Sequence, residues 1–244
     1  MLSKSQVKYI QSLGQKKVRD TESVFIAEGP KLLEELQKSD KANIVKIFAL
    51  RHWIDKNNLD NGKHEIVEIT EPELSKISTL KTPNEVIAIV KNPKIDFYPD
   101  LTGKLTIALD AIRDPGNLGT IIRTADWFGV RNIICSKDCA DCFNSKVVQS
   151  TMGSIIRINI IYDDLETRFK KYPGMHIYAT CLEGTDVRAM NKLKEGIIVI
   201  GNESNGVSSK MEKLITGKIT IPRIGKAESL NAAVATAIIL SHLS

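Results

Sequence analysis

The sequence predicts an α/β fold in two parts. The first is a smaller N-terminal α/β domain, and the second is a C-terminal domain with a mostly parallel sheet and helices on both faces. β-rich runs alternate with helical patterns throughout, and six of these runs lie in the second part. The segment NPKIDFYPDLTG, at about residues 92–103, contains two prolines and a glycine and is typical of a linker. We therefore expect domains over residues 1–98 and 104–244.

The N-terminal part begins with an apolar periodicity that predicts a helix, and β-rich composition predicts its strands. Proline at position 30 suits the first turn of a helix, as do the acidic residues that flank Pro72. The expected helices cover residues 7–13, 30–38 and 71–77, and the expected strands cover residues 24–27, 44–50, 65–69 and 85–90.

The C-terminal part repeats the alternation with longer helices, which predicts parallel strands joined by helical crossovers. The expected strands cover residues 105–109, 132–135, 155–161, 177–180, 197–200 and 219–221. The expected helices cover residues 118–128, 145–152, 165–171 and 230–242.

Composition places the chain among ordinary globular proteins, with 244 residues, 42% hydrophobic and 26% charged. The longest apolar run, at residues 232–240, is much shorter than a membrane span, and the beginning of the chain has no apolar core of a secretory signal. We therefore expect a cytoplasmic protein that does not enter a membrane. The net charge of +5, from 34 basic and 29 acidic residues, permits a polyanionic partner without requiring one.

Three of the four cysteines lie close together, at Cys135, Cys139 and Cys142, and the fourth is Cys181. A zinc site needs four ligands, usually in pairs at short spacing, and the histidines here are scattered. We expect free thiols in a reducing compartment and no metal. Nothing in the sequence assigns a role to the three clustered thiols.

Three loops at expected strand ends contain polar residues that packing does not explain, and ligands bind at such ends in parallel sheets. In the first loop, DAIRDPGNLG at residues 110–119, Asn117 suits a helix N-cap. In the helix that follows, Arg123 lies off the apolar stripe, so an exposed surface arginine is the simpler interpretation. The stripe itself consists of Leu118, Ile121, Ile122 and Ala125.

The second loop, GNESNGVS at residues 201–208, follows an apolar strand directly. Its glycines allow close backbone approach, and Glu203 has little structural purpose there, although a polar turn with a helix cap is the alternative. The third loop, IPRIGKAESLN at residues 221–231, offers Ser229 or Asn231 as the N-cap of the last helix. Dinucleotide, phosphate-loop, zinc-protease and serine-hydrolase motifs are absent from the sequence, which speaks against those enzyme classes.

Together and in this order, the three loops resemble the signature motifs of the SpoU (TrmH) family of RNA ribose methyltransferases. The motif residues are Asn117, Gly119 and Arg123 in the first loop, Gly201, Glu203 and Gly206 in the second, and Ile221, Pro222, Ser229, Leu230, Asn231 and Ala235 in the third. Further segments that resemble the family are residues 146–153, Arg19, Phe25, Glu28 and Gly29, and residues 82–90.

The resemblance implies an S-adenosylmethionine-dependent enzyme that methylates the 2′-hydroxyl of a ribose in RNA, with ribosomal RNA expected ahead of transfer RNA. It implies a deep trefoil knot in the C-terminal domain, a homodimer with active sites completed at the subunit interface, and an N-terminal domain similar to a ribosomal RNA-binding protein. The implied catalytic residues are Arg123, Asn117, Glu203, Ser229 and Asn231. The implied cofactor-binding residues are Thr180, Leu182, Gly201, Ile221 and Leu230, and the candidate RNA contacts are Lys16, Lys17 and Arg19.

The family's arginine is the proposed activator of the 2′-hydroxyl, but a guanidinium has a pKa above about 12 and stays protonated. An electrostatic role for Arg123, on a phosphate and on the charge developing at the 2′-oxygen, is therefore the alternative to a general base. Two other functions remain possible at this point. One is an RNA-binding protein without turnover, and the other is methylation of a small molecule or a protein.

Overall fold

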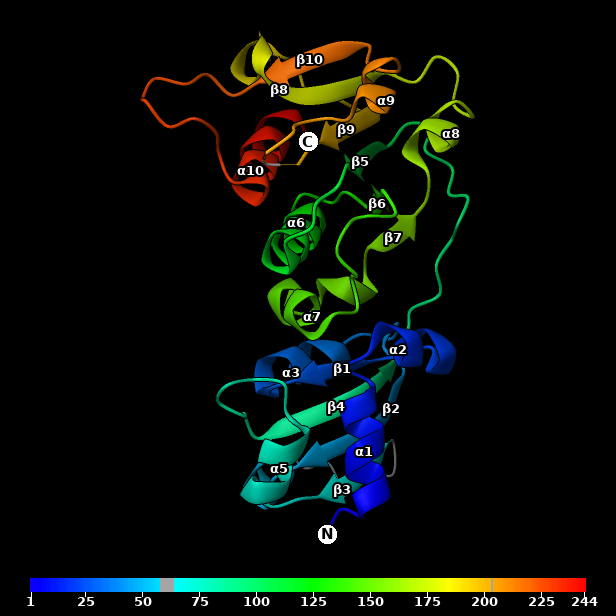
Figure 1. The fold of residues 1–244 in the computed structure, drawn as a ribbon, viewed down its shortest axis with the longest axis vertical. Helices are drawn as coiled ribbons and strands as arrows, with labels where there is room; N and C mark the ends of the chain where they lie inside the picture. Colours follow the sequence, from blue (N-terminus) through cyan, green and yellow to red (C-terminus); the bar gives the residue numbers. More distant parts are fainter. Residues whose placement is uncertain (58–63, 203) are drawn as a thin grey trace. The chain divides into compact units, whose positions relative to one another are not determined.

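The structure, a computed structural model, describes residues 1–57, 64–202 and 204–244. The chain divides into two compact units, whose elements are labelled in Figure 1. The first unit comprises Met1–Lys94 and Phe143–Ile156, and the second comprises Ile95–Cys142 and Arg157–Ser244.

The first unit contains, within the described residues, a four-stranded sheet in the order β1-β4-β2-β3. Strand β4 is antiparallel to both of its neighbours, and β2 and β3 are parallel. The strands are β1 (Val24–Glu28), β2 (Ile44–Ala49), β3 (Glu65–Glu68) and β4 (Val86–Lys91). The helices are α1 (Lys4–Ser12), α2 (Lys16–Glu22), α3 (Pro30–Gln37), α4 (Arg51–Lys56), α5 (Glu71–Ile77) and α7 (Ser145–Thr151), with a 3₁₀ turn at Ser154–Ile156.

The expected helices and strands of the first part are confirmed, with end shifts of a few residues. Helices α2 and α4 were not expected from the sequence. Both are short, and each buries a single side chain, Arg19 in α2 and Trp53 in α4. One buried residue leaves no apolar periodicity for a sequence pattern to detect.

The segment that contains α7 differs from the expectation. The helix is confirmed, but its residues belong to the first compact unit rather than to the second. Val147 and Val148 are buried, α7 packs against β1, and Phe143 stacks on Phe25 of that strand with ring centroids 5.3 Å apart. The helix ends at Met152, which has a φ of 48° and forms the left-handed cap.

The expected strand at residues 155–161 is wrong as a single element. Its first residues form the 3₁₀ turn in the first unit, and the strand itself begins at Asn159 in the second. Both halves of this isoleucine-rich run are buried, and a short apolar run does not distinguish a strand from another buried segment.

The second unit is built on a six-stranded sheet in the order β10-β8-β9-β5-β6-β7, in which every ladder is parallel among the described residues. The strands are β5 (Leu105–Leu109), β6 (Asn132–Cys135), β7 (Asn159–Tyr162), β8 (Ile177–Asp186), β9 (Gly196–Ile200) and β10 (Gly217–Thr220). The helices are α6 (Pro115–Trp127), α8 (Leu165–Phe169), α9 (Ser209–Glu212) and α10 (Ala232–Leu243), with a 3₁₀ turn at Val187–Ala189.

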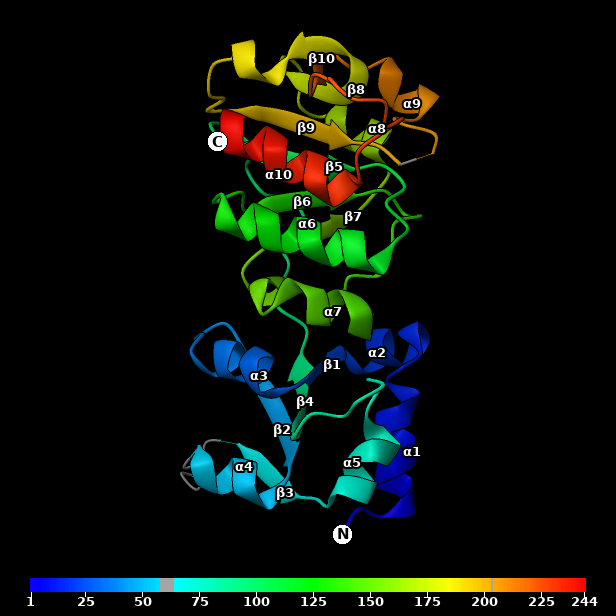
Figure 2. The same cartoon turned by 90° about the vertical axis from the view of Figure 1, so that its left-hand side faces the viewer.

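Helices cover both faces of this sheet, as expected. In Figures 1 and 2, α6 and α10 lie side by side on one face, and α8 and α9 lie on the other. Leu165 and Phe169 of α8 and Met211 of α9 join one buried cluster with the strands. None of the described helices is both long and apolar enough to cross a membrane.

Parallel pairing aligns the carboxyl ends of the central strands, with Leu109 of β5 opposite Ile200 of β9. On the other side of β9, β8 contains an irregularity. Its register with β10 passes from the pair Ala179 and Lys218 to the pair Thr185 and Ile219, so the intervening residues of β8 leave the ladder. Bulges of this kind redirect side chains at a sheet edge.

Candidate active site

A cavity of about 470 Å³ opens at the carboxyl ends of β8, β9 and β10 in the second unit. It is formed by the irregular part of β8, the second loop and the third loop, so segments far apart in the sequence contribute to one site. Its lining consists of Thr180, Cys181, Leu182, Ile200, Gly201, Asn202, Ser204, Gly206, Ile219, residues 221–225, Ala227, Glu228, Ser229, Leu230, Ala232, Ala235 and Ile239.

All five residues expected to bind the cofactor lie in this lining: Thr180, Leu182, Gly201, Ile221 and Leu230. Thr180 donates its hydroxyl proton to the carbonyl of Val199, at 3.1 Å, which ties the irregular segment of β8 to β9. Leu182 and Leu230 are 70% and 46% exposed, so apolar groups remain accessible at the rim of the cavity.

Gly201 occupies a position of the lining with no room for a side chain. A Cβ atom at this residue would lie 2.5 Å from the carbonyl oxygen of Gly206 and 2.5 Å from the nitrogen of Val207. The loop folds back on itself here because Asn202 and Gly206 exchange backbone hydrogen bonds of 3.0 and 2.8 Å. The wall of the cavity therefore requires glycine at position 201.

The beginnings of α6 and α10 meet through two asparagines. The amide nitrogen of Asn231 donates to Oδ1 of Asn117 at 2.7 Å, across 114 residues of sequence. Asn231 is also the N-cap of α10, since its Oδ1 accepts from the backbone of Ala233 and Val234. Ser229 lines the cavity just before this cap.

The expected capping role of Asn117 is wrong. Helix α6 begins at Pro115, and Asp114 is its N-cap, accepting the backbone N–H of Asn117 at 2.7 Å. The proline at the first helical position and the aspartate before it form the stronger start signal. The Asn117 side chain is consequently available for its contact with Asn231.

Arg123 is exposed on α6, and the apolar stripe of that helix is buried as expected. Its side chain has no hydrogen bond or ion pair with any residue that the structure describes, and it is not part of the cavity lining. Glu203 lies outside the described residues. Within the described chain, Asn117, Asn231 and the cavity with Ser229 are thus brought together, and Arg123 is not joined to them.

Asn202 and Cys181 are cavity residues that sequence reasoning missed. Asn202 sits between two motif positions, and its role depends on contacts with a loop distant in the sequence, so no local pattern could identify it. Burial raises the pKa of the Cys181 thiol, which keeps that side chain neutral in the cavity wall.

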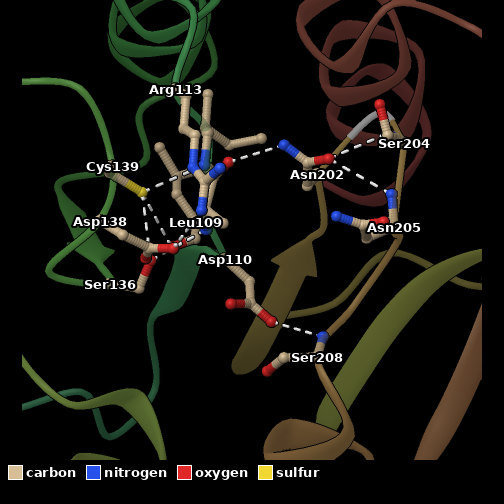
Figure 3. Close-up of polar contacts among 12 residues, drawn as sticks. Leu109, Asp110, Arg113, Ser136, Asp138, Cys139, Asn202, Ser204, Asn205 and Ser208 are labelled. Atoms are coloured by element: carbon tan, nitrogen blue, oxygen red, sulfur yellow. Dashed lines mark hydrogen bonds and ion pairs between the residues drawn. The ribbon is translucent and has the colours of Figure 1, made fainter.

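Of the three clustered thiols, Cys139 contacts the end of β5 and the first loop, and Figure 3 shows it near Ser136. Cys139 Sγ accepts the N–H of Ile112 at 3.3 Å and donates to the carbonyl of Leu109 at 3.3 Å. A hydrogen bond with the thiol of Cys135 lowers the pKa of Cys139 and raises that of Cys135, to which burial also contributes. All four cysteines are free, and the described residues contain no group of three or more side chains able to hold a metal.

The candidate RNA contacts on α2 differ in exposure. Lys16 and Lys17 are exposed, whereas Arg19 is buried and only 4% exposed. Arg19 donates from Nη1 to the carbonyls of Leu13 and Gly14, both at 2.8 Å. A guanidinium engaged in this way holds the turn between α1 and α2 and is not presented to a phosphate, so the expectation of an RNA contact is corrected for Arg19.

We expect Arg19→Leu to lower the free energy of unfolding by about 2 kcal/mol, since it removes two hydrogen bonds from a buried charged donor. Chemical denaturation of the whole protein measures this change. Lys17→Leu, on the exposed face of the same helix, should change the free energy by less than about 0.5 kcal/mol. Equal effects of the two substitutions would contradict a structural role for Arg19.

Comparison with known proteins agrees with this architecture. The model of the SpoU rRNA Methylase family matches residues 104–241, and a model of the MRM3-like substrate binding domain matches residues 4–88. The 23S rRNA (guanosine(2553)-2′-O)-methyltransferase RlmP of Bacillus subtilis is 31% identical over 243 residues, covering 97% of this chain and 95% of the relative.

Two solved structures share the fold over almost the whole chain. A putative RNA methyltransferase of the TrmH family from Porphyromonas gingivalis is 34% identical with a TM-score of 0.85, covering 99% of this chain and 98% of the other. An AdoMet-bound rRNA methyltransferase from Sinorhizobium meliloti is 33% identical with a TM-score of 0.83, covering 99% and 95%. The chain belongs to the SpoU rRNA Methylase family.

Proposed function

We propose that this protein transfers the methyl group of S-adenosylmethionine to the 2′-hydroxyl of a ribose in ribosomal RNA. The observation that carries the proposal is the meeting of the second and third loops around one cavity, with Asn117 of the first loop bonded to the beginning of the helix that follows the third. Family membership and the B. subtilis relative, whose name specifies 2′-O-methylation of 23S rRNA, support the same reaction.

The cavity fits the cofactor in size and chemistry. Its volume of about 470 Å³ lies in the range of about 300–1,000 Å³ that small-molecule sites occupy. Leucine and isoleucine side chains of the lining would suit the flat adenine base, and the loops would supply polar groups for the rest of the cofactor. Thr180, Leu182, Gly201, Ile221 and Leu230 would hold it. When bound, S-adenosylmethionine supplies a methyl group that its sulfonium has already activated.

The protein's own residues bring the ribose into line and stabilise the charge that develops on its 2′-oxygen. We assign that electrostatic role to Arg123, which also suits the bidentate binding of an adjacent RNA phosphate. Asn117 and Asn231, held together at 2.7 Å, orient the ribose or the guanidinium. Ser229 of the third loop and Glu203 of the second loop also contribute.

The protein acts as a homodimer in this proposal. Arg123 is exposed and absent from the lining of the cavity in its own chain, so a second copy would supply this residue. Exposed apolar side chains on α6, on α10 and on the third loop support an interface. They are Trp127, Val234 and Ile224, which are 85%, 48% and 96% exposed.

The proposal includes the deep trefoil knot and a cytoplasmic location. For the knot, the chain returns from β10 at the sheet edge to place α10 beside α6, and the Asn231 contact with Asn117 fastens that return. The cytoplasmic location is inferred from the proposed substrate, ribosomal RNA. Residues 1–98 would bind RNA, which the match to a substrate binding domain supports, and residues 104–244 would carry out the transfer.

We expect Lys16→Ala with Lys17→Ala to weaken RNA binding and to reduce the slope of log K against log salt by about 1.5, the value for two lost phosphate contacts. Fluorescence titrations at several salt concentrations measure the slope. The double variant Lys4→Ala and Lys8→Ala, also exposed and in the same unit, is the matched control. If the slope falls equally in both double variants, the effect comes from the loss of any two positive charges in the unit and not from specific phosphate contacts of α2.

The direct test measures transfer of labelled methyl from S-adenosylmethionine to total RNA from a strain that lacks the gene. Label in ribosomal RNA, resistant to alkaline hydrolysis at one 2′-methylated position, is the expected result. Label confined to transfer RNA would overturn the proposed substrate. The RNA fractions tested include RNA from ribosome assembly particles. If none of them is labelled although the cofactor binds, the enzymatic function itself is rejected.

A further inference from the structure

The second loop is fastened to the first loop at both of its ends, and Figure 3 shows the two attachments. At the far end, the carboxylate of Asp110 accepts the backbone N–H of Ser208 at 2.7 Å. At the near end, the side-chain amide of Asn202 donates to the carbonyl of Ala111 at 3.0 Å. Asp110 and Ala111 directly follow β5, so both attachments reach the segment that leads into α6.

Asn202 uses its two amide atoms for different tasks. Its Oδ1 accepts the backbone N–H of Ser204 at 2.9 Å and that of Asn205 at 3.3 Å, which shapes the tip of the cavity loop. Its Nδ2 points away from that tip toward Ala111. One side chain therefore organises the cavity wall and also connects that wall to the loop before α6.

The residue at the other end of this contact has an unusual backbone. Ala111 has a φ of 59°, the left-handed region, which residues with a Cβ adopt only when their surroundings impose it. Its N–H donates to Ser136 Oγ at 2.9 Å, and its carbonyl accepts from Asn202. Such conformations concentrate at functional sites, where the surroundings hold the backbone in place.

Resting on the proposed function, we infer that Asn202 is a positioning residue that couples the cofactor cavity to the beginning of α6, and thereby to Asn117 and to Arg123, which the proposed homodimer presents to the other subunit's cavity. When the cavity is occupied, the second loop is held in one conformation. Through the hydrogen bond from Nδ2 to Ala111, residues 110–114 are then held in one conformation as well. The residue acts through α6 rather than on the reacting atoms, so it should influence turnover more than cofactor affinity.

Asn202→Asp separates the two tasks. The substitution keeps the size of the side chain and an oxygen for the N–H groups of Ser204 and Asn205, but it replaces the Nδ2 donor with a second oxygen facing the Ala111 carbonyl. Asn205→Asp is the matched control, since it makes the same chemical change in the same loop on an exposed side chain outside the cavity lining.

The experiment compares wild type, Asn202→Asp and Asn205→Asp by calorimetric titration with S-adenosylmethionine and by single-turnover methyl transfer at saturating cofactor. For Asn202→Asp we expect a Kd within about threefold of wild type and a rate at least about tenfold lower, because a small misplacement of the catalytic groups is costly. Asn205→Asp should stay within about twofold in both measurements. Hydrogen exchange should show that the cofactor protects residues 111–117 in wild type and not in Asn202→Asp.

Equal behaviour of the two variants would overturn the inference, and so would a loss of affinity in Asn202→Asp that accounts for the whole loss of rate. If wild type itself transfers no methyl group, the proposed function fails, and the exchange measurement still decides the coupling. Should Asn202→Asp not fold, Asn202→Ser keeps an acceptor oxygen for the loop tip and is too short to place a donor at the Ala111 carbonyl as well, so the same separation of rate from affinity is expected.

Discussion

Arg123→Ala is expected to fold, to bind S-adenosylmethionine with a Kd within about threefold of wild type, and to lose methyl transfer by at least about 10²-fold, the usual effect of removing one electrostatic stabiliser. The side chain is exposed and makes no hydrogen bond or ion pair with the described residues, so its loss costs no packing. It also lies outside the lining of the cavity, so its loss removes no cofactor contact. Labelled methyl transfer, calorimetry and thermal unfolding on one preparation measure the three properties.

Arg131→Ala provides the matched control. Arg131 is an exposed arginine of the same unit, directly before β6 rather than on α6, and its substitution should leave transfer within about twofold. Arg123→Lys keeps the charge and loses the planar fork, so a rate between those of wild type and Arg123→Ala would indicate charge stabilisation. Transfer by Arg123→Ala within a few-fold of wild type would reject the assignment.

Mixing Arg123→Ala with Gly201→Ala at subsaturating cofactor, where each variant alone transfers little methyl, tests whether Arg123 acts on its own cavity or on that of the other subunit in the proposed homodimer. In a mixed dimer of Arg123→Ala and Gly201→Ala, one cavity is intact and faces an intact arginine only if the arginine crosses the interface. Random mixing should then restore about a quarter of wild-type activity, because half of the dimers are mixed and each has one complete site. An arginine that serves its own cavity would leave every mixture no more active than the average of the two variants measured alone.

Most of the second unit could be predicted from the sequence because its two long helices and its apolar strands are strongly patterned, whereas the short helix α9 and the beginning of β7 could not. The stripe of α6, with Leu118 and Ile122 among its members, is buried as the helical period requires, and Arg123 lies off it. The candidate cofactor residues came from the family resemblance, and the structure places all five in the lining of one cavity.

What the sequence could not provide depends on contacts between distant segments. The Phe143 contact with Phe25 assigns α7 to the first unit, although the chain places that helix in the middle of the second domain. Arg19 has the composition of a phosphate ligand, and only its two carbonyl acceptors reveal a structural role. The cap of α6 is a different case, because Asp114 directly before Pro115 is a local start signal, and Asn117 lies inside the helix.

Tertiary contact also explains why the sequence alone does not connect Asn117 with Asn231. Each suits a helix N-cap when it is considered by itself, and only the folded chain brings the two side chains together. Asn231 caps α10 with its oxygen and binds Asn117 with its nitrogen, so one side chain serves both structure and site. A cap found in the structure therefore does not argue against a functional role, because an asparagine amide has a donor and an acceptor that can be used independently.

Gly201→Ala is expected to raise the Kd for S-adenosylmethionine at least about tenfold and to reduce methyl transfer in proportion at subsaturating cofactor. The added Cβ would lie 2.5 Å from the Gly206 oxygen and from the Val207 nitrogen, and both are backbone atoms that no rotamer change can move away. Overpacking of this kind costs about 1–3 kcal/mol, and about 1.4 kcal/mol corresponds to a tenfold change in Kd. The strain falls on the second loop, which forms a wall of the cavity.

Gly225→Ala distinguishes this effect from a general cost of adding a methyl group near the cavity. Gly225 belongs to the third loop, and a Cβ built there meets nothing within 4 Å, so the unfolding temperature should equal that of wild type. For Gly201→Ala the loop must open, and thermal unfolding together with cofactor titration should both report it. If Gly201→Ala binds the cofactor as tightly as wild type does, the conformation of the second loop does not determine cofactor affinity. The residues that hold the cofactor are then those of β8 and the third loop.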